Sequence, residues 1–464
     1  MAGSKRYDAI IVGAGPAGIF AALELARSGR GGRIAVIERG KPIDKRRCPA
    51  RETHCVGCET CSIMTGWGGA GAFSDGKLTL SAEVGGWLGD HVGRETLERL
   101  LADADAVWVE FGATTEIHGP DEATAERLMR AATLAEMRLV PMRVRHIGTD
   151  RSPSVLQAMH DELVELGVDV RLSTAATRIV ADSGHVTGVE LADGTVVRSD
   201  TVILAPGRDG ADWLAEQARS LGIGLASNAV DIGVRVEVPA PVLEPLTEPL
   251  YEAKLIYYSK RFGDQVRTFC MNPYGEVTTE SYGDIVTVNG HSYADQRTAY
   301  TNFAVLVSQR FTHPFNDPIT YGQSIARLAN LLGGGILVQR LGDLRAGRRS
   351  TAKRIAQSVV EPTMPSATPG DLSFVLPYRH LADILEFLDA MDALAPGVAA
   401  DGTLLYGVEV KFYSSRLELD ADLQTQVAGL YAIGDGAGVT RGLLQSSASG
   451  IHVARAVLRS WHGR

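Results

Sequence analysis

Residues 7–40, YDAIIVGAGPAGIFAALELARSGRGGRIAVIERG, join two short apolar runs through a glycine-rich turn and a helix-like stretch. The run 9–12 is typical of a parallel strand that is buried on both faces. In such a turn the first glycine allows the sharp bend, the second lets the backbone approach a pyrophosphate, and the third lets the helix pack closely on the strand. Glu38 follows about 20 positions later, where an acidic residue binds a ribose hydroxyl. The stretch therefore predicts a dinucleotide-binding βαβ unit, with its pyrophosphate at the helix N-terminus.

A second glycine-rich stretch stands near the other end of the chain. Residues 430–455 read LYAIGDGAGVTRGLLQSSASGIHVAR, an apolar strand followed by Gly-Asp and then by small residues. The small residues at 445–450 allow the start of a helix to approach a flavin ring. The N–H groups and the dipole of that helix start stabilise negative charge on the reduced flavin. Together with the βαβ unit, this segment predicts that the cofactor is FAD.

The composition narrows the class of protein. A chain of 464 residues is too long for one ordinary core, so we expect two or more subdomains. The net charge of −9 argues against a nucleic-acid partner, since proteins that bind nucleic acids favour basic surfaces. The sequence has no stretch of about 18 uninterrupted apolar residues, and the first strand follows MAGSKRYD at once. We therefore expect a cytoplasmic protein with neither a membrane span nor a signal peptide.

The order of apolar runs and helix-like stretches predicts an α/β fold: a three-layer, Rossmann-like FAD-binding domain with an inserted α+β substrate or cap domain. Four short strands between 169 and 199 predict a β-meander. A second Gly-x-Gly-x-x-Gly after a strand is absent from the sequence, so we expect no stable NAD(P) domain. The predicted parts are 1–82 (first FAD-binding part), 83–150 (helical insertion), 151–229 (second FAD-binding part, with the meander), 230–404 (substrate or cap domain) and 405–464 (third FAD-binding part).

Several stretches of the chain resemble a bacterial family of uncharacterised FAD-dependent (NAD/FAD-utilising) dehydrogenases. The family is related in fold to the flavoproteins of fumarate reductase and succinate dehydrogenase. The most distinctive stretch is GWGGAGAFSDGKL at 66–78, and the others are 145–150, 231–237 and 409–450. The chain departs from the family pattern at 270–275 and at 289–292, where Asn272, Tyr274 and His291 replace the usual residues. The resemblance therefore implies a fold and FAD, and it does not extend to a shared substrate.

The resemblance also implies which residues hold the cofactor. The implied residues are Gly13, Gly15, Pro16, Ala17, Gly18, Glu38 and Arg39 for the ADP part, Ala176 for the adenine, Gly69, Ala70, Gly71, Ser74, Asp75 and Lys77 along the isoalloxazine, Asp435 on the ribityl or pyrophosphate side, Gly442, Leu443, Ser447, Ala448 and Gly450 at the pyrimidine edge, and in addition Gly207 and Gly434.

Four of the five cysteines, Cys48, Cys55, Cys58 and Cys61, lie within fourteen residues. This spacing is that of metal ligands, and both iron–sulfur clusters and tetrahedral zinc take four thiolates. Arg46 and its basic neighbours stand just before the cluster, where their positive field favours thiolates. The spacing alone leaves three alternatives open: an iron–sulfur cluster, zinc or another structural metal, and thiols that are redox-active or merely structural.

Three residues are candidates for catalysis. Lys77 follows the flavin loop and is placed to stabilise reduced flavin, although a surface lysine fits the pattern equally well. His146 and His291 are candidate general acids, but a lone histidine is more often a structural hydrogen-bonding group. Arg235 is suited either to a bidentate bond with an anionic substrate or to a salt bridge between domains.

We predict an FAD-dependent oxidoreductase that transfers hydride between flavin N5 and a small organic substrate, by dehydrogenation or reduction of a C–C or C–N bond. The electrons come from the substrate, from transiently bound NAD(P)H or from a redox partner protein. Three alternatives stay open. They are an electron-transfer flavoprotein wired through the cysteine cluster, a flavin-dependent RNA-modifying enzyme, and a protein that binds FAD only structurally.

Overall fold

The computed structural model describes residues 6–30, 32–48, 58–73, 76–148, 151–226, 228–250, 252–282, 285–292, 297–312, 314–315, 317–411 and 416–462. The chain forms two compact units. Unit 1 contains residues 1–117, 143–226 and 414–464, and unit 2 contains 118–142 and 227–413. Each unit has a hydrophobic core of its own. Among the described helices, none combines the length and the apolar character that crossing a membrane requires.

Unit 1 is built on a parallel sheet of five strands in the order β22-β10-β1-β2-β6. The strands are β1 (Ala9–Val12), β2 (Ile34–Ile37), β6 (Asp169–Arg171), β10 (Val202–Leu204) and β22 (Leu430–Ala432). The four strands β22, β10, β1 and β2 are buried throughout, because layers cover both faces of the sheet. The apolar runs at the two ends of the sequence therefore lie in one sheet, which confirms the predicted Rossmann-like α/β fold.

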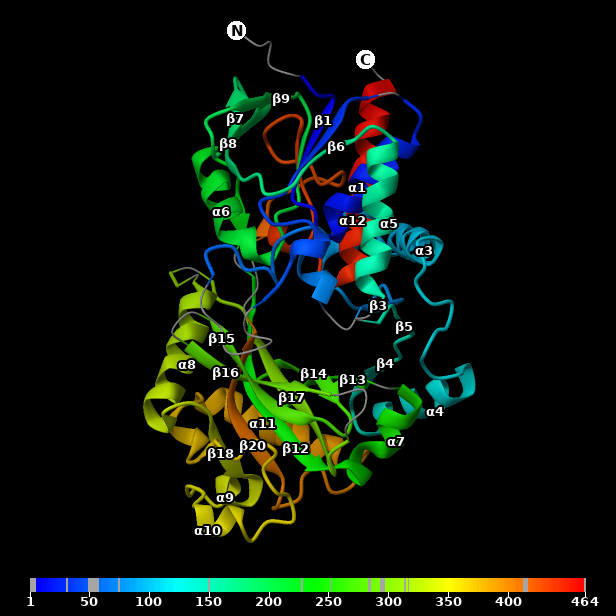
Figure 1. The fold of residues 1–464 in the computed structure, drawn as a ribbon. Helices are drawn as coiled ribbons and strands as arrows, with labels where there is room; N and C mark the ends of the chain where they lie inside the picture. Colours follow the sequence, from blue (N-terminus) through cyan, green and yellow to red (C-terminus); the bar gives the residue numbers. More distant parts are fainter. Residues whose placement is uncertain are drawn as a thin grey trace. The chain divides into compact units, whose positions relative to one another are not determined.

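Helices cover one face of this sheet, and a β-meander with α6 (Ala211–Ser220) lies on the other (Figure 1). The helices are α1 (Pro16–Arg27), α5 (Ser152–Glu165) and α12 (Leu443–His462), with α3 (Arg94–Glu110) packed on α12 and α2 (Leu88–Val92) packed on α3. A Cβ on Gly450 would lie 2.2 Å from the carbonyl oxygen of Ala17, so only glycine lets α12 pack this closely on α1. The meander consists of β7 (Ala176–Asp182), β8 (His185–Leu191) and β9 (Val196–Arg198).

Short elements connect these layers in unit 1. The two-stranded ladders are β3 (Lys77–Thr79) with β5 (Val144–His146), and β11 (Leu225–Ala226) with β21 (Arg416–Leu417). The 3-10 turns are η1 (Ile43–Lys45), η3 (Gly69–Phe73), η4 (Arg208–Gly210) and η6 (Asp435–Ala437).

Unit 2 is built on an eight-stranded sheet in the order β19-β18-β20-β12-β17-β14-β13-β4. The strands are β4 (Arg138–Val140), β12 (Val230–Pro239), β13 (Lys254–Tyr258), β14 (Gln265–Asn272), β17 (Tyr300–Gln309), β18 (Leu337–Arg340), β19 (Thr368–Pro369) and β20 (Leu404–Lys411). Neighbouring strands are antiparallel except β18 and β19. We expected the chain to return to the FAD-binding part from residue 405, whereas β20 completes the sheet of unit 2 between β12 and β18.

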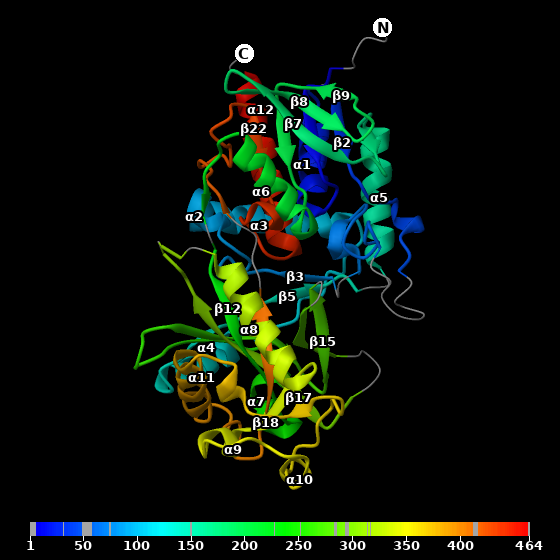
Figure 2. The same ribbon diagram turned by 90° about the vertical axis from the view of Figure 1, so that its left-hand side faces the viewer.

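The helices of unit 2 are α4 (Glu122–Leu134), α7 (Ala240–Leu250), α8 (Pro318–Gly333), α9 (Leu341–Arg345), α10 (Ala352–Ile355) and α11 (Tyr378–Met391). The hairpin β15 (Glu276–Tyr282) and β16 (Ile285–His291) and a last 3-10 turn, η5 (Leu372–Phe374), complete the unit. Figure 2 shows α8 beside β12 and β18, which it contacts.

The central strand β12 explains how this sheet is covered. Its sequence, VDIGVRVEVP, alternates valine or isoleucine with polar residues or glycine, so one face of the strand is apolar. The apolar face packs into the core with α7 and α11. The other face is also buried and carries Asp231, Arg235 and Glu237, because β16 packs across it. Buried charges of this kind require partners, and the partners form the polar face described below.

Candidate functional site

The three glycines of the turn after β1, Gly13, Gly15 and Gly18, have different surroundings. Gly13 has φ +104°, and a Cβ there would lie 2.1 Å from the carbonyl oxygen of Ala205. A Cβ on Gly18 would lie 2.0 Å from the carbonyl oxygen of Gly13. A Cβ on Gly15 would instead meet, within 4 Å, a single described atom, the Cα of Gly69 at 3.9 Å. The first and third glycines are thus required by packing, whereas the second borders open space at the start of α1.

Glu38, at the end of β2, is buried and ties three segments of the unit together. Its carboxylate accepts hydrogen bonds from the backbone N–H groups of Ala14 at 2.9 Å, Gly40 at 2.7 Å and Gly66 at 3.0 Å. An ionised carboxylate accepts about four such bonds, and these three backbone groups fill most of that capacity. The neighbouring Arg39 forms an ion pair with Asp209, which follows Gly207 in the loop after β10.

Residues 61–73 form a loop that lies against the glycine turn. Gly68 donates its N–H to the carbonyl oxygen of Ala14 at 2.8 Å, and a Cβ on Gly69 would lie 3.0 Å from the Cα of Gly15. The distinctive stretch 66–71 is therefore brought to the predicted pyrophosphate turn. Ser74 and Asp75, which were predicted to line the flavin, lie outside the described residues.

Arg46 holds this loop in place. Its guanidinium donates to the carbonyl oxygens of Ser62 at 2.9 Å, Ile63 at 2.8 Å and Trp67 at 2.7 Å, and it stacks on the ring of Phe73. Burial lowers the pKa of Arg46 to about 10. The sequence suggested a positive field beside the cysteines, and Arg46 does interact electrostatically with Cys61. Its hydrogen bonds to the backbone carbonyls make it a structural anchor as well.

The closing segment reaches the same edge of the sheet. Gly434 has φ +77°, and a Cβ there would lie 3.1 Å from the Cβ of Ala17 at the start of α1. Asp435 accepts hydrogen bonds from the hydroxyls of Thr440 and Ser446, each at 2.9 Å, and burial raises the pKa of its carboxyl. Gly442 precedes α12 with φ +93°, and a Cβ there would meet no described atom within 4 Å.

The first turns of α12 are fixed by partners from other elements. The hydroxyl of Ser447 accepts a hydrogen bond from Nε1 of Trp108 at 3.1 Å, and Ala448 is fully buried. A Cβ on Gly71 would lie 2.3 Å from Cδ2 of Leu443, so the loop and the helix start touch. Gln445 donates from Nε2 to the carbonyl oxygen of Val84 at 2.7 Å, while its Oε1 is buried without a hydrogen-bond partner among the described residues. Sequence reasoning missed this unpaired acceptor, because only the fold buries it.

Two of the three catalytic candidates lie opposite each other. β3 and β5 are antiparallel, and their register pairs Lys77 with His146, both of which are half-buried. β3 also packs against α12. Arg145 anchors this ladder, since its guanidinium makes a bidentate bond to Asp105 of α3 with both distances at 2.7 Å. His291 is not part of this pair, because it lies in unit 2 on β16, opposite Glu276.

The remaining predicted residues are Ala176 and the cysteines. Ala176 begins β7 of the meander in unit 1, opposite Leu191. Cys48, Cys58 and Cys61 have free thiols, and Cys55 lies outside the described residues. Within the described ranges, no three histidine, cysteine or acidic side chains converge as metal ligands.

Arg235 is fully buried and lies at the centre of the polar face of β12 in unit 2. Its guanidinium makes two 2.8 Å bonds to the carboxylate of Glu409 and further bonds to Asn302 Oδ1 at 2.8 Å and the carbonyl oxygen of Cys270 at 3.0 Å. Arg235 and Glu409 belong to the same unit. The arginine is therefore neither a bridge between domains nor available to an anionic substrate, since its donors are satisfied within the sheet.

Two segments of the chain match protein-family models. Residues 8–45 match the family model "FAD binding domain", and residues 230–412 match "FAD-dependent protein, C-terminal domain-like". An uncharacterised protein from Clostridium beijerinckii is 28% identical over 97% of this chain and 81% of its own length. The protein FixC of Escherichia coli K12 is 29% identical over 51% of this chain, and this match spans 45% of FixC.

Solved structures are more distant. Glycine oxidase from Bacillus cereus is 13% identical, with a TM-score of 0.38 over 98% of this chain and 96% of that one. Escherichia coli quinol fumarate reductase FrdA is 13% identical, with a TM-score of 0.43 over 99% of this chain and 71% of that one. At these identities and TM-scores the solved structures carry no assignment, so the class of the protein rests on the two family models.

The family matches and the glycine-rich edge together define the class: the chain is an FAD-dependent oxidoreductase, as the sequence predicted. Within that class it combines an N-terminal FAD-binding segment with the C-terminal domain found in FAD-dependent proteins.

Proposed function

We propose that FAD binds along the glycine-rich edge of unit 1 and that hydride passes between the flavin and a small organic substrate. The observation that carries the proposal is the convergence of four separate segments at one edge of the parallel sheet. These segments, called the glycine edge from here on, are the turn 13–18, Glu38, the loop 66–71 and the closing segment 434–450.

The residues of the glycine edge fit the chemistry of FAD. Gly15 and Gly442 border open space, so they admit a ligand close to the backbone. What remains of the acceptor capacity of Glu38 suits a ribose hydroxyl. The unpaired Oε1 of Gln445 suits a donor such as the N3–H of an isoalloxazine. When bound, FAD supplies a hydride acceptor and donor at N5.

The protein supplies binding, orientation and electrostatics at this edge. The N-termini of α1 and α12 present backbone N–H groups that carry partial positive charge. At α1 these groups suit a pyrophosphate, and at α12 they suit the negative charge that develops on a reduced flavin. Asp435 holds the segment before α12 in place through Thr440 and Ser446.

We propose Lys77 as the side chain that stabilises reduced flavin, with His146 as its neighbour in proton transfer. Their cross-strand pairing on β3 and β5 supports a shared role, because directly opposed side chains in an antiparallel ladder interact. His291 stays a separate candidate for a general acid. We expect Lys77→Met to lower the reduction potential of the bound flavin, since a nearby positive charge stabilises the anionic reduced form.

The deciding experiment is anaerobic reduction of the purified protein, followed by its visible spectrum. Flavin bands that bleach with NADH, NADPH or a small amine or acid donor support the proposal. Failure of every organic donor and both nicotinamides to bleach a stoichiometric flavin would contradict hydride transfer while leaving FAD binding intact. Iron and sulfide assays on the same sample test whether the cysteines hold a cluster and serve a redox partner.

A further inference from the structure

We propose that Cys58 and Cys61 of unit 1 form a dithiol that glutathione disulfide, or a similar small disulfide, oxidises reversibly to a disulfide bridge, and that the bridge makes the protein hold FAD more tightly. The two cysteines stand at the start of the loop 61–73, which lies against the glycine turn. The effect on FAD rests on the proposed function, whereas the thiol chemistry does not.

The two thiols are accessible and close along the chain. Cys58 is exposed and Cys61 is half-buried, and both carry free thiols. The chain bends at Glu59 and Thr60, which brings the two cysteines closer together than an extended segment would. Two intervening residues are the spacing of the Cys-x-x-Cys redox motif. A bridge needs only these two side chains, whereas a metal site needs a larger group, and none converges within the described ranges.

The fold holds Cys61 in place, whereas Cys58 is the accessible member of the pair. The carbonyl oxygen of Cys61 accepts hydrogen bonds from the backbone N–H groups of Met64 at 3.1 Å and Thr65 at 2.9 Å. The guanidinium of Arg46 interacts electrostatically with Cys61. This arrangement suits thiol–disulfide exchange, in which an accessible thiolate attacks first and a second thiol resolves the mixed disulfide.

The exchange balances in atoms and electrons. The thiolate of Cys58 attacks one sulfur of glutathione disulfide, whose S–S bond breaks, and one glutathione leaves and takes up a proton. Cys61 then attacks the sulfur of Cys58 in the mixed disulfide and releases the second glutathione. The protein has lost two electrons and two protons, and the two glutathione thiols carry them. Excess glutathione reverses both steps.

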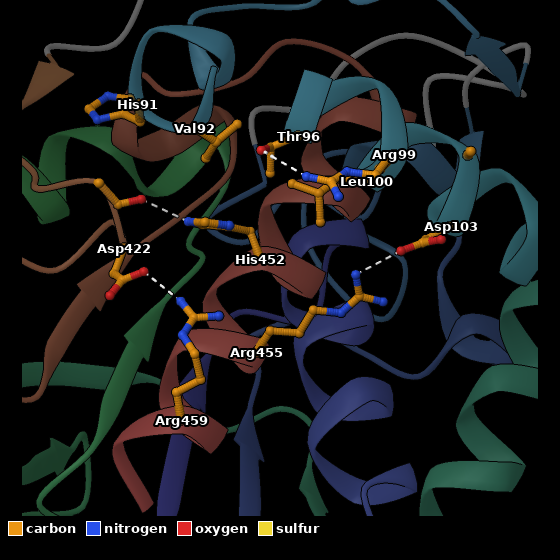
Figure 3. Close-up of a pocket in the computed structure, with 12 residues that line it drawn as sticks. His91, Val92, Thr96, Arg99, Leu100, Asp103, Asp422, His452, Arg455 and Arg459 are labelled. Atoms are coloured by element: carbon orange, nitrogen blue, oxygen red, sulfur yellow. Dashed lines mark hydrogen bonds and ion pairs between the residues drawn. The ribbon is translucent and has the colours of Figure 1, made fainter. Parts of the chain in front are cut away.

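The pocket between α2, α3 and α12 offers no comparable chemistry (Figure 3). Its arginines are paired, Arg455 with Glu24 and Asp103, and Arg459 with Asp422. No cysteine is among the described residues that line it. The charges of the pocket are therefore satisfied within the protein, whereas the thiols of the Cys-x-x-Cys pair are available for reaction.

The loop connects the thiol pair to the glycine turn. Arg46 interacts with Cys61 and donates a hydrogen bond to the carbonyl oxygen of Trp67 at 2.7 Å. The next residue, Gly68, donates its N–H to the carbonyl oxygen of Ala14. A bridge between the two cysteines restricts the segment that enters this loop, and a restrained loop loses less freedom when FAD binds. The oxidised protein should therefore release FAD more slowly than the reduced protein.

Incubation of the FAD-loaded protein in glutathione buffers tests the thiol pair. Peptide mass mapping should find a bridge between Cys58 and Cys61 in excess glutathione disulfide and none in excess glutathione. Cys58→Ser and Cys61→Ser should each prevent the bridge, whereas Cys270→Ser, which removes a half-buried thiol of unit 2, should not. Three results would overturn the proposal: no bridge in the wild type, a bridge to Cys48 instead, or iron or zinc bound in stoichiometric amount.

The rate of FAD release after dilution, followed by flavin fluorescence, tests the link to the cofactor. The oxidised wild type should release FAD about threefold more slowly than the reduced one, and Cys58→Ser should release it at one rate in both buffers. Equal rates for the wild type, or a difference that persists in Cys58→Ser, would overturn the link. A protein that passes both tests but is reduced by no organic donor or nicotinamide contradicts the proposed hydride transfer alone.

Discussion

The glycine edge of unit 1 and the polar face of unit 2 both gather groups from distant parts of the chain, but they use different parts of the residues. At the glycine edge the groups proposed to meet a ligand are mainly backbone N–H groups beside the open space at Gly15 and Gly442, with few side chains among them. At the polar face the groups are charged side chains that are buried and paired with each other, as in Arg235 with Glu409. The first arrangement is open toward a ligand, whereas the second is closed within the protein.

Because of this difference, we expect mutations at the glycine edge to affect ligand binding and mutations at the polar face to affect stability. A backbone cradle presents donors that the protein itself leaves unused, so a change there affects the ligand first. A buried ion pair has already lost its water, so removing one partner leaves an uncompensated charge and affects folding first. The predictions below test whether the two regions respond in these different ways.

The largest effect is expected at the polar face, from Arg235→Met. Both side chains of the Arg235–Glu409 pair are fully buried, so the variant should lose about 3–5 kcal/mol of unfolding free energy in unit 2. Urea denaturation followed by intrinsic fluorescence measures this loss. The combined Arg235→Met and Glu409→Met protein should recover part of it, because no charge is then left unpaired.

Arg310→Met is the control for this variant, since Arg310 is exposed at the end of the same sheet. We expect a change within about 0.5 kcal/mol for the control. A loss of less than about 1 kcal/mol for Arg235→Met would show that the polar face is open to water and thus to ligands, which would remove the contrast with the glycine edge.

The next effect is expected at the glycine edge, from Gly15→Val. The new side chain would enter the open space above the start of α1, where the nearest described atom is 3.9 Å from the Cβ position. We expect the protein to stay folded and its affinity for FAD to fall about 100-fold, about 2.7 kcal/mol. Fluorescence titration of the apoprotein with FAD measures the affinity, and circular dichroism verifies the fold.

Gly15→Ala provides a graded control, because its methyl group is smaller and should cost less affinity than valine. If Gly15→Val unfolds the protein or keeps its FAD, the open space beside Gly15 does not hold the cofactor. Gly13→Val is expected to behave differently and to prevent folding, since its Cβ would overlap the backbone of Ala205.

The same contrast explains what the sequence could predict. The turn 13–18 and the segment 434–450 can be predicted from the sequence. Glycines at a fixed spacing indicate a backbone conformation that depends on neighbouring residues alone. Arg235 was identified from the sequence as a candidate for an ionic contact. Its partner Glu409 lies 174 residues away on β20, and no local sequence pattern indicates that pairing. The anchoring role of Arg46 was missed for a similar reason. Its three carbonyl partners lie about 16 to 21 residues further along a loop without regular structure.

The division of the chain between the units shows the same limit. The short strand β4, at 138–140, pairs with β13 of unit 2, whereas β5, at 144–146, pairs with β3 of unit 1. Each strand is only three residues long, RLV and VRH, and only tertiary pairing assigns each one to its sheet.

A smaller effect on the glycine edge is expected from Arg46→Gln. The substitution would leave carbonyls of Ser62, Ile63 and Trp67 without donors and loosen the loop that lies against the glycine turn. We expect FAD affinity to fall about tenfold, with faster amide exchange across 61–73. Arg46→Lys should not restore the affinity, because an ammonium does not reproduce the planar fork of three donors. Full FAD affinity in both variants would show that the loop does not contribute to the cofactor site.

The smallest effect is expected from a second buried group of unit 2, and it depends on pH. Burial raises the pKa of Asp383 to about 6, and the neighbouring Asp264 adds to the shift. Because this pKa lies above the ordinary value of 3.8, the protonated form favours the folded state. The stability that it contributes is complete below about pH 4 and is lost as the pH rises through 6.

Asp383→Asn keeps the shape of the protonated carboxyl and cannot ionise. Its stability relative to the wild type should therefore rise between pH 4 and 6 and stay constant above 7. We expect a gain of about 1 kcal/mol, because the pKa of Asp264 is shifted in the opposite direction and offsets part of the effect. Asp389→Asn, at an exposed position of the same helix, is the control and should show no such rise. A gain that is equal at pH 4 and pH 8 would mean that Asp383 does not titrate in the folded protein.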